Sequence, residues 1–381
     1  MRVPKDLEPT AWARARAARG VVPYDLTVSN PTLCDIPYPH SLLDVLRDPA
    51  GLIYKPDPKG LLSAREAVAR EYRTRGVAVD PERIVLTASS SESYGFLFKL
   101  LCDPGDAVLT PAPSYPLFAH LAALDGAHAV PFALDPTDRW QPHPPAAPDT
   151  AGTRAAILVH PNNPTGSWVE PAAAEKLACC TGSGKIPLIV DEVFLEYPLV
   201  PDAAAGTFAA RSAGLTFTLG GLSKSRGLPQ LKLSWIVVSG PEAEVASALE
   251  SLAFIGDSYL SAGTPVQNAL PELFARAAPV RDAILARCLE NLESARRMAA
   301  AIPGVELLEP GGGWSAVLRF PRVIPEDALV MELLERHGVA IYPGYFFDFA
   351  TEGYLVVSLL TVPGAFSLGF TRTLDAIASR L

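Results

Sequence analysis

Paired cysteines are missing from this sequence. It has five cysteines, an odd number, and no two of them are separated by the two residues typical of zinc and redox motifs. They are Cys34, Cys102, Cys179, Cys180 and Cys288. We therefore expect neither a disulfide framework nor a structural zinc site, and we expect a reducing compartment.

Long apolar runs and an excess of basic charge are also missing. No apolar stretch reaches the length of a membrane span, and residues 1–20 contain no apolar core of the signal-peptide type. The formal net charge is −9, and the lysines and arginines are scattered along the chain. We therefore expect a cytoplasmic protein that binds neither membrane nor nucleic acid.

Apolar runs of strand length alternate with helical patterns over the first two thirds of the chain. Because these runs are apolar throughout, they indicate a mainly parallel, seven-stranded sheet covered by helices on both faces, an α/β fold. Such sheets place ligands at the carboxyl ends of their strands. The expected strands are residues 83–89, 106–113, 128–134, 154–161, 186–194, 214–221 and 232–240, with helices at 91–101, 115–124 and 171–180.

The pattern changes near residue 266, where a long helical region at 267–302 precedes further strands and a helix at 367–381. With 381 residues, the chain is long enough for one large and one smaller domain. We predict a large domain at 48–265, a smaller α+β domain at 266–381, and an N-terminal segment, 1–47, that joins the smaller domain. The proline-rich stretch 135–152 is predicted to be a surface loop.

Residues able to bind a ligand follow three of the predicted strands. Ser90 and Ser91 begin a helix, where hydroxyls and free amides suit a phosphate, although serines also cap helices for purely structural reasons. Asn163 lies in the turn HPNNPTGSW after the strand 154–161. Asp191 ends a strongly apolar strand, where a carboxylate is costly unless it faces a cation, whereas Glu192 is expected to be its solvated neighbour.

Lys224 lies in an unusual setting, the hydroxyl- and glycine-rich turn GGLSKSRG after the strand 214–221. Phosphate-binding amides, a carboxylate at a strand end and a lysine in such a turn are together what pyridoxal phosphate requires. The phosphate needs amides and a cation, the ring nitrogen needs a carboxylate, and the aldehyde needs a lysine amine.

The order and spacing of these residues resemble those of a known family. With the motifs PNNPTG, DEVF and SKSRGLPQLKLSW, and the upstream elements YKPDPKGLLSAREAVA and PSYP, the chain is similar to class I/II aminotransferases from about Leu26 onward. These are fold-type I enzymes that depend on pyridoxal phosphate. The resemblance implies transfer of an amino group between an amine or amino-acid donor and a keto acid or aldehyde.

The resemblance also implies roles around the cofactor ring. Lys224 would form the Schiff base and move the proton between the substrate carbon and the cofactor. Asp191 would partner the ring nitrogen, and Asn163 would donate to the ring 3-oxygen. Tyr115 would stack on one face of the ring and Val193 would pack on the other.

Around the phosphate, the resemblance implies ligands from two subunits. Ser90, Ser91 and Ser223 would bind the phosphate within one chain. Tyr54 and Thr264 would reach the phosphate of the neighbouring subunit, which implies a homodimer with shared active sites.

One departure from the family pattern concerns the substrate. Where most relatives have an arginine that clamps the substrate carboxylate, this sequence has Val356. Either another cation replaces it, with Arg226, Arg322 and Arg372 as candidates, or the substrate carries no carboxylate there. The second possibility leaves open a lyase, decarboxylase or oxidative enzyme of specialised metabolism with the same cofactor.

Further departures concern the cofactor and the pocket. The family's tyrosine near the ring oxygen is Phe194, and its phosphate-binding arginine is Lys232, which lacks the planar fork of a guanidinium. The stretch YPGYFFDF at 342–349 and Trp314 suggest a hydrophobic substrate end, although both could equally pack in the core.

Overall fold

The fold is built on one large sheet, described by a computed structural model that covers residues 8–146, 152–182, 184–200 and 206–381. Its strand order is β2-β9-β8-β7-β6-β3-β4-β5. The pairs from β8 through β7, β6 and β3 to β4 are parallel, whereas β9, β2 and β5 run antiparallel to their neighbours. The strands are β2 (Ile84–Thr87), β3 (Ala107–Ala112), β4 (His128–Asp135), β5 (Gln141–His143), β6 (Thr153–Val159), β7 (Leu188–Asp191), β8 (Thr216–Gly221) and β9 (Ser234–Ser239).

All seven predicted strands are present, and β5 is an eighth. It lies inside the stretch 135–152 that was predicted to be a loop, so that prediction is wrong for residues 141–143. The strand forms because Gln141 is buried, donates to the carbonyl of Trp168 and accepts from the amide of Glu170. At the edge of a sheet, Pro142 costs no ladder hydrogen bond.

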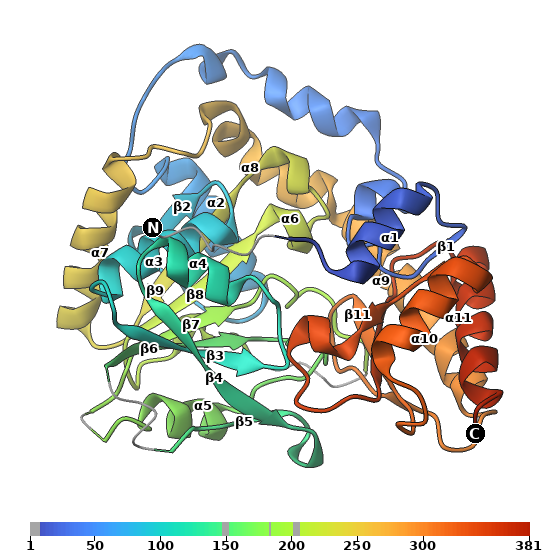
Figure 1. Ribbon diagram of the computed structural model, residues 1–381. Coiled ribbons are helices and arrows are strands. Elements are labelled where there is room, and N and C mark those ends of the chain that lie inside the picture. Colours follow the sequence, from blue (N-terminus) through green and yellow to red (C-terminus); the bar gives the residue numbers. More distant parts are fainter. Residues whose placement is uncertain (1–7, 147–151, 183, 201–205) are drawn as a thin grey trace.

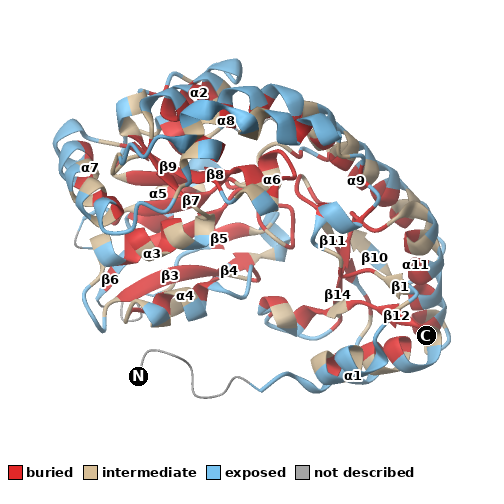
Figure 2. Ribbon diagram, turned by 90° about the horizontal axis from the view of Figure 1, so that it is seen from above, coloured by how far each residue is buried: buried red, intermediate tan, exposed pale blue. Residues whose placement is uncertain are grey.

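Helices cover both faces of this sheet, as the apolar strands predicted. Side chains alternate along each strand, so Ile157 packs toward α3 (Ser90–Leu101), α4 (Phe118–Leu124) and α7 (Glu242–Asp257). Its neighbour Leu158 packs on the opposite face with α5 (Pro171–Ala178). Figure 2 shows the strands buried and the outward faces of the helices exposed. Each buried Ile or Leu contributes about 1.5–3 kcal/mol.

The C-terminal part of the chain is a separate arrangement of helices around a smaller sheet. The sheet has the order β10-β11-β14-β13 and is antiparallel throughout. Its strands are β10 (Glu306–Leu308), β11 (Ser315–Arg319), β13 (Tyr342–Pro343) and β14 (Tyr354–Ser358). The helices of this part and those leading to it are α8 (Thr264–Arg276), α9 (Ala278–Ala299), α10 (Glu326–Glu332) and α11 (Pro363–Ala378). Helix α2 (Leu62–Thr74) precedes β2 in the chain and packs against α8.

The N-terminal residues pack on this C-terminal part. Strand β1 (Tyr24–Asp25) pairs in parallel with β12 (Val339–Ala340), and α1 (Ala11–Arg19) contacts α10. In Figure 1 these blue N-terminal elements lie beside the red C-terminal helices, and the chain then crosses to the large sheet. The domain limits 1–47, 48–265 and 266–381 remain a prediction.

Disulfide bonds and membrane-spanning helices were not expected from the sequence, and the structure bears on both. All five cysteines are free thiols. Within the described ranges, none of the helices combines the length and apolarity that crossing a membrane requires.

Candidate active site

One cavity of about 360 Å³ brings most of the predicted site residues together. It lies where the carboxyl ends of the parallel strands meet the C-terminal part of the chain. The predicted residues that line it are Ser90, Ser91, Tyr115, Asn163, Asp191, Val193, Phe194, Lys224 and Val356. A volume in this range suits a small cofactor together with a substrate.

Asp191 is the last residue of β7 and is buried in the floor of this cavity. Its Oδ2 accepts a hydrogen bond from the Tyr94 hydroxyl at 3.0 Å, and its Oδ1 accepts one from the Val193 amide at 3.1 Å. Burial raises the pKa of Asp191 to about 6, against the lowering effect of the two donors and of the Lys224 ammonium. The carboxylate is therefore ready to pair with a buried cation.

Lys224 lies on the short helix α6 (Leu222–Ser225), which follows β8 directly. Its Nζ is 4.9 Å from the centre of the Trp314 ring and 5.7 Å from that of Phe194. The Tyr197 hydroxyl donates to the Lys224 carbonyl at 2.6 Å, which fixes the backbone that carries the amine. Desolvation by burial lowers the pKa of Lys224, and the charge of Asp191 partly opposes this.

Steric crowding explains why the residue before this helix, Gly221, is a glycine. A Cβ on Gly221 would collide with the side chain of Ser234 on the neighbouring strand β9. The tight approach of β8 and β9 therefore leaves no room for a side chain at position 221.

Helix α3 presents its N-terminus to the same cavity. Ser89 is the N-cap and accepts from the amide of Glu92 at 3.1 Å, so the structural capping role belongs to Ser89. Ser90 and Ser91 are thus the first two helical residues and line the cavity. The amides at this end lack intrahelical acceptors and carry the positive end of the helix dipole, which suits a phosphate.

The turn after β6 separates the roles of its two asparagines. Asn162 is buried and has a structural role, because it accepts from Ser114 and donates to the carbonyl of Pro113 and the hydroxyl of Thr165. Asn163 lines the cavity, and its Oδ1 accepts from Ser315 at 3.5 Å. That bond directs the amide nitrogen of Asn163 to other acceptors.

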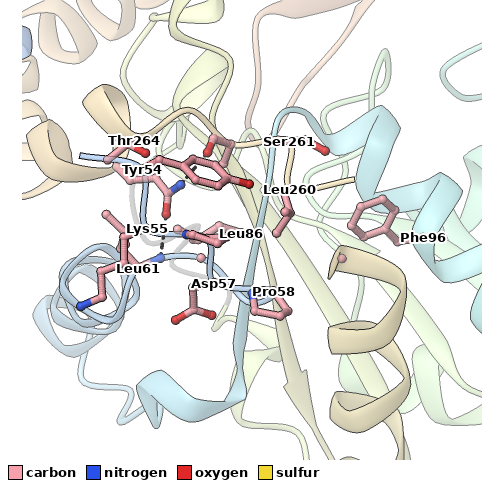
Figure 3. A pocket seen from close by; sticks show the side chains of 15 residues that line it. Tyr54, Lys55, Asp57, Pro58, Leu61, Leu86, Phe96, Leu260, Ser261 and Thr264 are labelled. Atoms are coloured by element: carbon pink, nitrogen blue, oxygen red, sulfur yellow. Dashed lines mark hydrogen bonds between the residues drawn. The ribbon is translucent and has the colours of Figure 1, made fainter. Parts of the chain in front are cut away.

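Four predicted residues do not line this cavity. Ser223 is partly buried on α6, and Lys232 is exposed, with a left-handed backbone at φ 51°. Tyr54 and Thr264 line a separate, small pocket, and Figure 3 shows their side chains next to each other there. Tyr54 is 77% exposed, so its ring is free to contact another molecule.

The predicted exposure of Glu192 is wrong. Its side chain is buried and accepts hydrogen bonds from the Thr207 hydroxyl and the Phe208 amide, both at 2.6 Å. Burial raises its pKa to about 7. Along a strand end, neighbouring side chains point to opposite faces, and here the second face is covered by residues 207–208.

The candidate replacements for the missing arginine lie elsewhere. Arg226 is buried in ion pairs with Glu71 and Glu196. Arg322 and Arg372 are exposed, and Arg372 donates to the carbonyl of His337. These three arginines do not line the cavity.

Three further residues complete the site, of which the two tyrosines had no role in the sequence analysis. Tyr94 contacts Asp191, Tyr197 holds the Lys224 backbone, and Trp314 flanks the amine. Trp314 had been considered for the pocket. The two tyrosines lie in apolar patterns, and their roles depend on contacts between distant segments. Among the described residues, we find no cluster of side chains suited to a metal ion.

Comparison with known proteins agrees with this geometry. The family profile for aminotransferase class I and II matches residues 48–362. The chain is 27% identical over 350 residues to a glutamate–pyruvate aminotransferase of Haemophilus influenzae, which covers 88% of this chain and 85% of that protein. It is 30% identical over 365 residues to an arginine–pyruvate transaminase of Pseudomonas aeruginosa, which covers 91% and 88%.

Solved structures show the same fold. An aminotransferase from Escherichia coli superposes with a TM-score of 0.83 at 25% identity, covering 98% of this chain and 95% of that one. An alanine aminotransferase from Pyrococcus furiosus gives a TM-score of 0.83 at 23% identity, covering 97% and 95%. The chain belongs to the class I and II aminotransferases, has the fold-type I architecture and is an aminotransferase.

Proposed function

We propose that this aminotransferase uses pyridoxal phosphate held in the cavity by Lys224, Asp191, Asn163, Tyr115 and the N-terminus of α3. The observation that carries the proposal is the meeting of a buried carboxylate and a desolvated lysine amine in one cavity. The donor set suits the cofactor because it offers an amine, an anion for a cationic ring nitrogen, and amides for a phosphate. When bound, the cofactor supplies an electron sink for negative charge at the substrate carbon.

Lys224 is proposed to act as nucleophile and as proton carrier. Because burial lowers its pKa, a larger fraction of its amine is unprotonated near neutral pH than for a free lysine. With the cofactor bound, the Lys224 amine would be the group that accepts a proton from the substrate carbon and, as the ammonium, gives that proton back as the amino group is transferred. The rings of Trp314 and Phe194 exclude water from one side of this amine.

Asp191 is proposed to keep a proton on the ring nitrogen. A cation at this place would satisfy the buried carboxylate and lower its pKa, which burial raises to about 6 despite the two donors and Lys224. Tyr94 and the Val193 amide hold the two carboxylate oxygens in place. Val193 is proposed to pack on one face of the ring and Tyr115 on the other.

The remaining cofactor contacts are proposed from where the residues lie in the sequence and in the cavity. The hydroxyls of Ser90 and Ser91 and the amides beside them would bind the phosphate, with Ser223 and Lys232 further along the chain as additional ligands. Phe194 would pack near the ring, and the Asn163 amide would donate to the ring oxygen.

Borohydride trapping tests this proposal. Reduction of the cofactor-loaded protein, followed by peptide mass spectrometry, is expected to place the cofactor mass on Lys224. Lys224→Ala is expected to lose the trapped mass, whereas Lys176→Ala, which removes an exposed lysine outside the cavity, keeps it. Trapping on another lysine, or trapping that survives Lys224→Ala, would refute the assignment.

A homodimer with shared sites is part of the proposal. Tyr54 and Thr264 lie outside the cavity of their own chain, and Tyr54 follows the exposed apolar residues Leu52 and Ile53 in the sequence. Leu52 is 90% exposed and Phe254 is 79% exposed, which is costly unless another surface covers them. Tyr54 and Thr264 would then contact the phosphate in the partner subunit.

Subunit mixing tests the shared site. Lys224→Ala and Tyr54→Ala chains, each weakly active alone, are expected to regain activity when refolded together, because one site of each hybrid dimer has both residues intact. No recovery in a mixture that sedimentation shows to be dimeric would contradict the contribution of Tyr54 from the partner.

For substrates, we propose a primary amine or amino acid as donor and a keto acid or aldehyde as acceptor. Membership of the family supports transamination over the lyase, decarboxylase and oxidative alternatives. A reducing, cytoplasmic location is proposed from the five free thiols.

A further inference from the structure

The cavity has a second group of lining residues beyond those assigned to the cofactor. Val356 on β14 lies opposite Tyr342 on β13 in the small antiparallel sheet. Phe346 and Phe347 line the cavity beside them, and Trp314 links this group to Lys224. We refer to these five residues as the apolar wall.

Positive charge is missing from this part of the site. Among the described residues that line the cavity, Lys224 is the only lysine or arginine. Its amine is proposed to be committed to the cofactor, next to Asp191. Arg226, the cation nearest to it in sequence, is fixed in buried ion pairs with Glu71 and Glu196.

The hydroxyls near the apolar wall do not compensate for the missing cation. Thr27 donates its proton to Asp25 at 2.5 Å, Ser358 donates to the carbonyl of Val28, and Ser315 donates to Asn163. The protons of these three hydroxyls are therefore committed to other acceptors and are not offered to a carboxylate in the remaining space.

We infer that the apolar wall receives a neutral, largely apolar substituent, so that the preferred amine substrate has no carboxylate on the carbon that bears the amine. A carboxylate placed there would lose its hydration without a cation among the described lining residues to pair with it, apart from the Lys224 amine assigned to the cofactor. An aliphatic or aromatic substituent would instead bury apolar surface against Val356 and the rings. This inference rests on the proposed function, because it concerns the substrate of the same site.

Two matched ligand pairs test the inference. Calorimetry on the cofactor-loaded protein compares 3-phenylpropan-1-ol with 3-phenylpropionate, which differ in the charged group and not in the apolar body. Single-turnover absorbance compares 2-phenylethylamine with L-phenylalanine as amine donors. The alcohol is expected to bind at least about tenfold more tightly than the acid, and the amine to react at least about tenfold faster than the amino acid.

Three variants sharpen the comparison. Val356→Arg is expected to reverse both preferences, because it adds the missing guanidinium to the apolar wall. Because Val356 is buried and its replacement can disturb folding, Ser29→Arg adds a cation from an exposed residue that also lines the cavity. Val323→Arg is the matched control, since Val323 is exposed and does not line the cavity.

The outcomes distinguish failure of the substrate inference from failure of the proposed function. Tighter binding of the acid by the wild type would overturn the inference and place a cation there from outside the described chain. Equal preference in the wild type and in both cavity variants would also overturn it. If the cofactor is trapped on Lys224 in all these proteins, the proposed function stands while the inference fails. Absence of trapping on Lys224 would refute the proposed function itself.

Discussion

The hydroxyl of Tyr94 donates a hydrogen bond to Oδ2 of Asp191 at 3.0 Å, in a region closed to solvent. Tyr94 comes from α3, the helix whose N-terminus faces the cavity, and Asp191 ends β7. The same helix therefore serves two parts of the proposed cofactor, the phosphate at its end and the ring nitrogen through Tyr94.

Loss of this hydroxyl should weaken catalysis more than folding. Tyr94→Phe removes a donor to a charged acceptor, worth about 1.5–3 kcal/mol, so we expect a roughly 10- to 100-fold fall in kcat. The pKa of the Asp191 carboxyl should rise, since a stabilising donor is lost. Steady-state kinetics measures the effect, with Tyr24→Phe as a control outside the cavity. An unchanged kcat would show that Tyr94 has only a packing role.

Capture of the cofactor by Lys224 should depend on pH. The lowered pKa of Lys224 predicts that the rate of capture rises with pH to a plateau, with a midpoint below the 10.5 of an ordinary lysine. Asp191 opposes this lowering, so Asp191→Asn should move the midpoint to still lower pH. Stopped-flow absorbance from pH 6 to 11 measures the rate. A higher midpoint in Asp191→Asn would contradict the electrostatic account.

Glu192 should make stability fall as the pH rises. Its pKa is about 7 in the folded protein and near 4.5 when unfolded, so between these values the folded state binds more protons. The free energy of unfolding must then decrease from pH 5 to pH 8 through this group. Glu192→Gln lacks this titrating group. The free energy of unfolding of the wild type should therefore fall relative to that of the variant as the pH rises from 5 to 8. Urea unfolding of the cofactor-free proteins measures it, and a pH-independent difference would refute it.

Glu326 should position the apolar wall by holding the backbone segments that carry its residues. Its buried carboxylate accepts from the amides of Gly353 at 2.7 Å, Tyr354 at 2.9 Å and Tyr345 at 3.3 Å. Tyr345 directly precedes Phe346, and Gly353 and Tyr354 lead into β14, which carries Val356. Glu326→Gln replaces one acceptor oxygen with a donor, so we expect KM to rise about 5- to 10-fold with kcat nearly unchanged. Glu332→Gln, on the same helix but facing Arg380, is the control. An equal fall in kcat would point to a general loss of structure.

Much of this molecule could be predicted from sequence, for identifiable physical reasons. The parallel strands are apolar on both faces, so β6 and β7 were clear as strands. Asp191 and Lys224 stood out because charged groups are unusual at such strand ends. The turn around Lys224 proved to be a helical turn, a local detail that glycine and serine leave undecided.

Other features depend on contacts that no local pattern encodes. Strand β5 lies among prolines and exists because β4 and the Trp168 carbonyl are beside it. Glu192 was expected in solvent, but residues 207–208 cover it. Tyr94 has the spacing of a core aromatic, and only the meeting of α3 with β7 gives its hydroxyl a partner.

Chemical rescue of Lys224→Ala tests the central claim most directly, that the Lys224 amine moves the proton at the substrate carbon. With cofactor and a saturating amine donor, the single-turnover rate of the variant should fall about 100- to 10,000-fold below wild type. Added methylamine should restore part of that rate in proportion to its unprotonated concentration, and should leave the wild type unchanged. A variant that reacts at the wild-type rate without added amine would contradict the claim.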